Sequence, residues 1–85
     1  MATSVTLRFF ASIREAIGEG TQPWTTSAAD LSGLRDELIA RGDPYAQCLA
    51  RGNSVRIALN QALCDESTLV ADGAEVAFFP PVTGG

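Results

Sequence analysis

The chain contains no histidine and only two cysteines among its 85 residues. Without histidine, Cys48 and Cys64 cannot form a Cys-His catalytic pair or a self-contained zinc centre of the usual ligand types. Two thiols are also too few for a disulfide framework. We therefore expect no metal site, and we interpret both cysteines as small apolar side chains in a reducing compartment.

Lysine is also absent, so all six basic residues are arginines, and they are scattered along the sequence. Nucleic-acid binding requires clustered positive charge, whereas this chain has a formal net charge of −4 at pH 7. We expect no nucleic-acid partner, and the overall charge favours a protein partner with a basic surface. The lack of lysine further means that the chain cannot be linked to copies of itself through side-chain amines.

No apolar run approaches the roughly 20 residues that span a bilayer. The sequence passes from Met1 directly into a strand pattern, without the charged and apolar segments of a signal peptide. We therefore expect a cytoplasmic protein with no membrane partner. With 46% apolar and 19% charged residues, a chain of this length can form one small globular domain.

The apolar residues follow strand and helix periods in a mixed order. Period-two alternation predicts strands at residues 4–10, 21–26, 55–59, 62–64 and 75–79, the second of them near an edge because it contains Pro23. Helical spacing predicts a main helix from Leu31 to the stop at Gly42, and short helices near residues 12–17 and 44–49. This order predicts an α+β fold in which a sheet wraps around one main helix.

Local signals mark several ends and turns of these elements. Ser12 and Glu15 have the spacing of a capping box, and Ser27 or Asp30 can cap the main helix. Asp43 before a proline has the pattern of an N-cap followed by proline at the first helical position. Residues 60–61, Asn-Gln, are expected to turn a hairpin.

The sequence changes character after Phe79. We divide the chain into a folded domain at residues 1–79 and an extended C-terminal arm at residues 80–85, which has the sequence PPVTGG. Consecutive prolines fix φ and exclude a helix, and six extended residues reach about 20 Å. Terminal glycines let another protein approach the carboxylate closely because they carry no Cβ.

A terminal carboxylate is a poor electrophile until a partner converts its oxygen into a leaving group, most simply by adenylation. The sequence contains no phosphate-binding glycine loop with which to activate itself. These features indicate a carrier that other enzymes act on.

Phe10 and Phe79 fall on the nominally polar faces of the first and last strands. If these strands are neighbours, the two rings lie side by side near the start of the arm. An exposed aromatic patch there is typical of a docking surface. The alternative is that both rings pack under a loop as part of the core.

The closing segment DGAEVAFFPPVTGG, residues 72–85, resembles the C-terminal signature of the small-subunit family of molybdopterin synthase. The sequence FFA at residues 9–11 followed by Arg14-Glu15 is similar to that family's first strand and helix, and Asn60-Gln61 matches its hairpin turn. The resemblance runs along essentially the whole chain, although residues 42–53 match no motif. It implies a β-grasp fold, a ubiquitin-like mixed sheet wrapped around one main helix.

The resemblance also implies a function in molybdenum cofactor biosynthesis. A ubiquitin-activating-like adenylyltransferase would use ATP to adenylate the C-terminal glycine, and sulfur would then replace the adenylate to give a thiocarboxylate. The large synthase subunit would take up the arm and transfer the sulfur to cyclic pyranopterin monophosphate, forming molybdopterin. The chain itself would be a non-catalytic carrier subunit that binds no cofactor, in an assembly of two small and two large subunits.

The resemblance assigns roles to ten residues. Gly85 would carry the sulfur, with Gly84 beside it in the reacting segment. The remainder of the arm would contact partners, and the large subunit would also touch the domain itself; these positions are Phe10, Arg14, Leu63, Phe79, Pro80, Pro81, Val82 and Thr83.

Three other functions share parts of this pattern. A sulfur carrier for thiamine biosynthesis would share the fold, the Gly-Gly end and the adenylation. A ubiquitin-like protein modifier would use the same activated end to form isopeptide bonds. A simple interaction module would have an inert arm, and only the chemistry of the C-terminus distinguishes it from the others.

Overall fold

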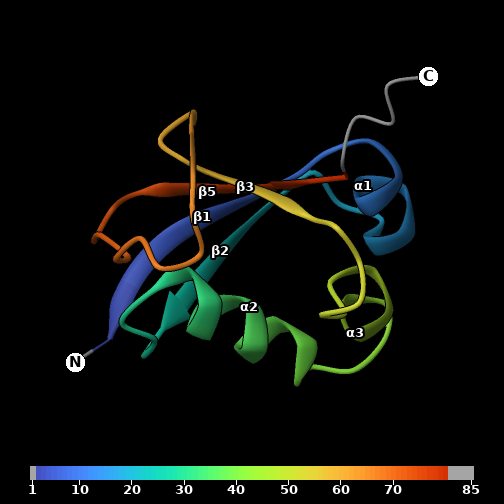
Figure 1. Ribbon diagram of the computed structural model, residues 1–85, viewed down its shortest axis with the longest axis horizontal. Coiled ribbons are helices and arrows are strands. Elements are labelled where there is room, and N and C mark those ends of the chain that lie inside the picture. The colour runs from blue at the N-terminus through green and yellow to red at the C-terminus, as the bar shows by residue number, and fades with distance from the viewer. Residues whose placement is uncertain (1, 81–85) are drawn as a thin grey trace.

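The computed structural model describes residues 2–80, which form a sheet covered on one face by a helix (Figure 1). The strands are β1 (Thr3–Phe9), β2 (Thr21–Thr26), β3 (Arg56–Leu59), β4 (Ala62–Cys64) and β5 (Glu75–Phe79). The helices are α1 (Ala11–Ile17), α2 (Leu31–Ile39) and α3 (Tyr45–Cys48). The predicted α+β fold and its order of elements are confirmed.

The five strands form one mixed sheet in the order β2-β1-β5-β3-β4. The central strands β1 and β5 are parallel, with Leu7 opposite Val76, and every other pair is antiparallel. β2, which contains Pro23, lies at one edge as predicted, because proline cannot donate a hydrogen bond to a further strand. The first and last strands of the chain are therefore neighbours at the centre of the sheet.

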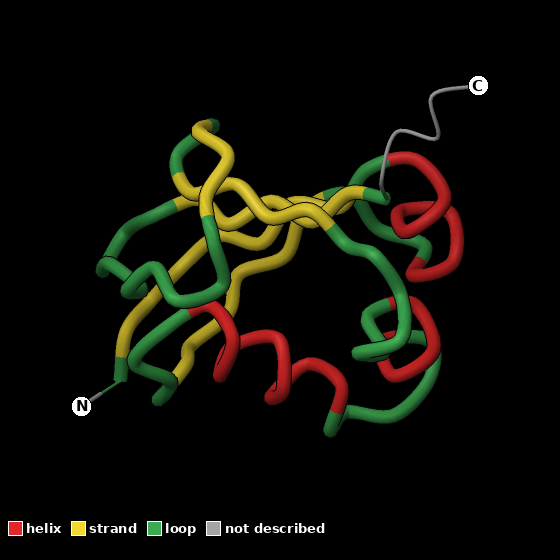
Figure 2. The backbone as a smooth tube through the Cα atoms, in the orientation of Figure 1, coloured by secondary structure: helices red, strands yellow, loops and turns green. Residues whose placement is uncertain are grey.

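The core lies between the sheet and α2, which crosses one sheet face (Figure 2). Alternate residues of β1 point toward the helix, and Leu31, Leu34 and Leu38 of α2 meet them with no exposed surface. Burying each side chain of this size contributes about 1.5 to 3 kcal/mol. The buried apolar cluster consists of Val5, Leu7, Phe9, Ile13, Leu31, Leu34, Leu38, Tyr45, Leu49, Ile57, Ala74, Val76 and Phe78.

Two of the predicted helix caps are wrong, and the structure decides between Ser27 and Asp30 as the cap of the main helix. α1 begins after Phe10 with no side-chain capping bond, so Ser12 and Glu15 do not form a capping box. The N-cap of α3 is Pro44 rather than Asp43, again without a side-chain bond. In α2 the cap is Asp30, whose carboxylate accepts a 2.9 Å hydrogen bond from the Gly33 amide.

β5 ends at Phe79, at the end of the sheet where α1 packs against it (Figure 1). The described part of the chain finishes at the next residue, Pro80. Among residues 2–80 no helix combines the length and apolar character needed to cross a membrane.

Candidate partner-binding surface

The outer face of the sheet is the face turned away from α2. It carries most of the predicted contact residues that the structure describes. Opposed residues in adjacent strands share a face, so the pairing of Arg56 with Phe79 places both side chains there. The next row crosses four strands, because the register pairs residues in the order Arg8, Ala77, Ala58 and Leu63. The outer face is thus apolar at its centre and bordered by two arginines.

Phe10 and Phe79 lie beside each other at the α1 end of the outer face. Their ring centroids are 6.0 Å apart with planes at 85°, the edge-to-face arrangement that aromatic pairs favour. The Phe10 amide donates a hydrogen bond to the Phe78 carbonyl, which fixes the spacing of the two backbones. Phe10 is 39% exposed and Phe79 is half-buried. The predicted juxtaposition is confirmed, and the role of the rings as a partner contact stays a prediction.

The remaining described contact residues lie at different distances from this pair. Leu63 in β4 is 61% exposed and lies on the same face, separated from β1 by the two strands β5 and β3. Arg14 is exposed one helical turn beyond Phe10, whose carbonyl accepts a hydrogen bond from the Arg14 amide. Pro80 is half-buried and directly follows β5. Five predicted site residues lie outside the described residues, namely Pro81, Val82, Thr83, Gly84 and Gly85.

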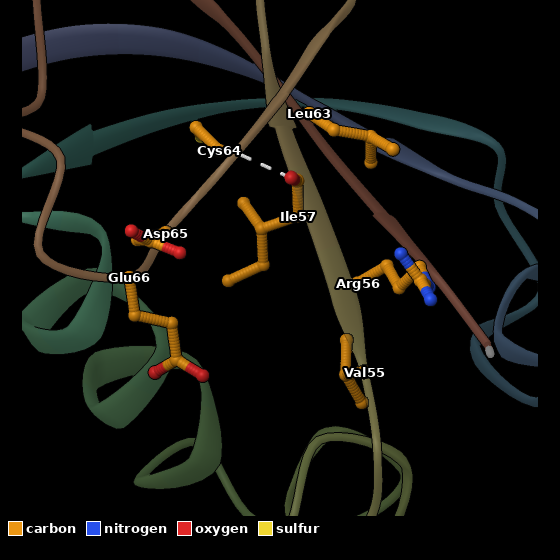
Figure 3. A pocket seen from close by; sticks show the side chains of 7 residues that line it. All are labelled: Val55, Arg56, Ile57, Leu63, Cys64, Asp65 and Glu66. Atoms are coloured by element: carbon orange, nitrogen blue, oxygen red, sulfur yellow. Dashed lines mark hydrogen bonds between the residues drawn. The ribbon is translucent and has the colours of Figure 1, made fainter.

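The β3–β4 hairpin forms a shallow depression next to the outer face (Figure 3). Leu63 and Arg56 point to one side of the hairpin and Ile57 to the other, into the core. Asn60 and Gln61 both have positive φ, of 50° and 71°, as a tight two-residue hairpin turn requires. This turn sets the register that presents Leu63 on the outer face.

Arg8 and Arg56 belong to this surface but are not among the predicted contact residues. Sequence alternation places Arg8 on the polar face of its strand, but its proximity to Phe79 depends on the pairing of β1 with β5. Likewise, only the β3–β5 register brings Arg56 next to Phe79. Period-two alternation assigns a face to a residue but does not identify its neighbours on other strands.

Cys48 is not an activated nucleophile. Burial, with the nearby Asp43 carboxylate, raises the pKa of the Cys48 thiol, which disfavours the reactive thiolate. The thiol of Cys64 faces the Ile57 carbonyl at 3.8 Å. Within residues 2–80 no group of three or more acidic or thiol side chains is placed to hold a metal ion.

Several known proteins resemble this chain over almost its full length. A model of the ThiS family matches residues 7–85. The molybdopterin synthase sulfur carrier subunits of Haemophilus influenzae and Escherichia coli are 40% and 39% identical to it, covering 91% of this chain and 94% of each relative. Small archaeal modifier protein 3 of Haloferax volcanii is 32% identical, covering 93% of this chain and 96% of that protein.

Solved structures show the same fold. The small archaeal modifier protein 1 of Methanosarcina acetivorans matches with a TM-score of 0.80 at 22% identity, covering 100% of this chain and 99% of that one. A chain in the complex of subunits 1 and 2 of the molybdopterin-converting factor from Helicobacter pylori matches with a TM-score of 0.63 at 32% identity. That match covers 98% of this chain and 100% of the other. The β-grasp fold is confirmed.

Proposed function

The chain belongs to the ThiS family, and we propose that it is the sulfur carrier subunit of a molybdopterin synthase, with Gly85 as the residue that carries the sulfur. The observation that carries this proposal is the family match, which extends to Gly85 itself. It is supported by bacterial relatives at 40% and 39% identity that are named molybdopterin synthase sulfur carrier subunits. The aromatic pair beside the end of β5 is a suitable docking surface for such a carrier.

The proposed chemistry takes place at the Gly85 carboxylate. In the first step a carboxylate oxygen attacks the α-phosphorus of ATP on an adenylyltransferase, which forms the acyl adenylate and releases pyrophosphate. A sulfur donor at the oxidation level of sulfide then attacks the acyl carbon and displaces AMP, which leaves a thiocarboxylate. This chain supplies no catalytic group to either step; it presents an end with no Cβ on the last two residues, which allows close approach by the enzyme.

The proposed acceptor is cyclic pyranopterin monophosphate, held by the large synthase subunit. Five residues follow Pro80, so an extended arm reaches at most about 17 Å beyond it. That reach is sufficient for the last residue to enter the active site of a protein docked on the outer face. The Helicobacter pylori complex of subunits 1 and 2 supports a two-subunit assembly, and we propose two small and two large subunits in it.

A second candidate function is protein modification. The 32% identity to small archaeal modifier protein 3 favours it, because a modifier would use the same activated C-terminus. It would transfer Gly85 to an amine of another protein and release AMP, and no sulfur would appear in the product. A sulfur carrier for thiamine biosynthesis would instead form the same thiocarboxylate but would not supply the molybdopterin synthase large subunit.

The deciding experiment is the intact mass of the chain after incubation with the adenylyltransferase, ATP and a sulfur donor. We expect one carboxylate oxygen to be replaced by sulfur, and we expect the product to convert cyclic pyranopterin monophosphate to molybdopterin once the large subunit is added. The chain without Gly85 is the control and should gain no sulfur. Isopeptide conjugates without thiocarboxylate would favour the modifier, and a thiocarboxylate that the large subunit cannot use would favour the thiamine carrier.

A further inference from the structure

The six arginines divide into two groups of three. Arg35 is buried and donates hydrogen bonds to the carbonyls of Leu49, Ala50 and Asn53. The Arg41 guanidinium carbon lies 4.9 and 4.2 Å from the ring centroids of Trp24 and Tyr45. Arg51 forms ion pairs with Asp36 and Glu66. These three positive charges are engaged on the helix side of the sheet.

The other three, Arg8, Arg14 and Arg56, make no side-chain hydrogen bond to any residue in the range 2–80. Arg8 and Arg56 lie on the outer face and border its apolar centre, whereas Arg14 lies in α1 with its side chain near Gly20. Two positive charges without a side-chain hydrogen bond among residues 2–80 therefore lie on the outer face of a chain whose net charge is −4.

Arg8 is held in place although its side chain makes no hydrogen bond within residues 2–80. Its guanidinium carbon lies 5.4 Å from the centroid of the Phe10 ring, and a Glu75 carboxylate oxygen lies 3.7 Å from one of its terminal nitrogens. That distance allows an ion pair but is too long for a hydrogen bond. Its Nε is buried with no partner among the described residues, while the side chain as a whole is 37% exposed. Buried donors without acceptors are uncommon in folded proteins and call for a physical explanation.

Between the two arginines the outer face is apolar. Ala58 and Ala77 lie at its centre and are each only 4% exposed, because their larger neighbours cover them. The apolar surface that a partner side chain can reach is that of Leu63, which is 61% exposed, and of Phe10, which is 39% exposed. Any group beside such a side chain would then face the guanidinium of Arg8 or Arg56, where a carboxylate could accept charge-assisted hydrogen bonds.

We propose that the large synthase subunit packs apolar side chains against Leu63 and the Phe10–Phe79 pair and places carboxylates against Arg8 and Arg56, and that these ion pairs contribute to partner selection. This inference rests on the proposed function and adds the chemistry of the contact. The net charge of the chain alone predicts a basic partner. At contact, however, local charges dominate, because salt screens charges more than about 8 to 10 Å apart.

The test is calorimetric binding of the full chain to the large subunit, at about 0.05 and 0.5 M salt. We expect Arg8→Gln and Arg56→Gln each to raise the dissociation constant about five- to tenfold at low salt, as expected when an interfacial ion pair is lost. The double variant should lose most of the salt dependence. Arg51→Gln is the matched control, since it removes the same charge from the helix side and should leave binding unchanged.

Circular dichroism of each variant verifies that it is folded before binding is measured. The carboxylate contact would be overturned if the dissociation constant of the wild type did not change with salt. It would also be overturned if the Arg8→Gln and Arg56→Gln variants bound like the parent. Neither result would affect the proposed function. The proposed function fails separately if the wild-type chain does not bind the large subunit and acquires no sulfur. Tighter binding by the double variant would also overturn the inference, since it would show that the arginines face positive charge.

Discussion

Phe78 and Phe79 are adjacent in β5 but point to opposite faces of the sheet. Phe78 has no exposed surface and stacks on Phe9 at a centroid distance of 5.9 Å. Phe79 lies on the outer face beside Phe10. The same residue type therefore supports stability at one position and is available for recognition at the next, because strand side chains alternate.

For Phe78→Ala we expect a loss of about 3 to 5 kcal/mol in the free energy of unfolding, because the surrounding core can close only partly around the cavity. Such a loss is a large share of the total stability of a small domain. Urea denaturation followed by circular dichroism measures it. A variant as stable as the parent would show that this ring is not in the core.

For Phe79→Ala we expect a small change in melting temperature but a loss of about 2 kcal/mol or more in binding to the large subunit, roughly thirtyfold in dissociation constant. Calorimetry of binding, paired with thermal unfolding of the isolated variant, separates the two effects. Leu69→Ala is the control, since Leu69 is 68% exposed but lies in the loop between β4 and β5. Normal folding together with normal binding would remove the ring from the docking surface.

Glu37 links the end of β2 to α2 through its carboxylate. It accepts hydrogen bonds from the Trp24 indole at 3.1 Å, the Thr26 hydroxyl at 2.7 Å and the Ser27 amide at 3.2 Å. Burial by itself would raise the pKa of Glu37, but these bonds together outweigh it and hold the pKa below the ordinary value of 4.5. The folded state thus favours the ionised carboxylate more than the unfolded state does.

A lowered carboxyl pKa stabilises the fold above the unfolded pKa, and this contribution disappears as pH falls through the folded pKa. We therefore expect the stability difference between the wild type and Glu37→Gln to be constant near neutral pH and to shrink below about pH 4.5. Urea denaturation at a series of pH values measures this difference. A gap that stays constant down to the acid limit would show that the pKa of Glu37 is not lowered.

At the scale of elements, a single side chain of α2 organises the loop after α3. Arg35 is only 3% exposed and makes hydrogen bonds to Leu49, Ala50 and Asn53 carbonyls, while its other end meets Glu66 at 2.7 Å. The Ala50 carbonyl also accepts a 2.9 Å hydrogen bond from the Asn53 amide, and otherwise the loop has little regular structure to satisfy its carbonyls. Helix, loop and the segment after β4 are therefore coupled through the buried Arg35 guanidinium, in addition to the exposed ion pairs of Arg51.

We expect Arg35→Met to cost about 2 to 4 kcal/mol in stability, because three carbonyls and a carboxylate lose their buried partner. Arg51→Met, which removes exposed ion pairs, should cost less than about 1 kcal/mol. Hydrogen exchange resolved by residue should show the Arg35→Met effect first at residues 49–55. Equal effects of the two substitutions would contradict the role assigned to Arg35.

For the whole molecule, we predict that the proposed reacting end can be removed without loss of the fold. Among the described residues, the buried cluster extends from Val5 to Phe78. We expect the chain lacking Gly85 to keep the parent melting temperature and to lose all sulfur transfer. Thermal unfolding and the molybdopterin synthesis assay measure the two properties. Activity retained by the shortened chain would reject Gly85 as the carrier residue.

The sequence by itself determined the order and type of the helices and strands. Local periodicity predicts the strands β1 and β5 from their alternation and the helix α2 from the spacing of its leucines. Pro23 predicts a sheet edge because proline lacks a backbone N–H. The sequence predicted the helix caps less well. Its spacing predicted Ser12 and Asp43 as N-caps, but the N-caps of α1 and α3 are Phe10 and Pro44. Caps depend on the entering backbone, which local spacing does not fix.

Only the tertiary structure decided which residues share the outer face. Arg8, Phe79 and Arg56 come from three strands that are distant along the chain, and their proximity results from the order β1-β5-β3 and its register. A shift of one residue in that register would turn Phe79 into the core and Phe78 outward. Packing against α2 excludes this alternative, because the apolar face of each strand must be buried at the same time.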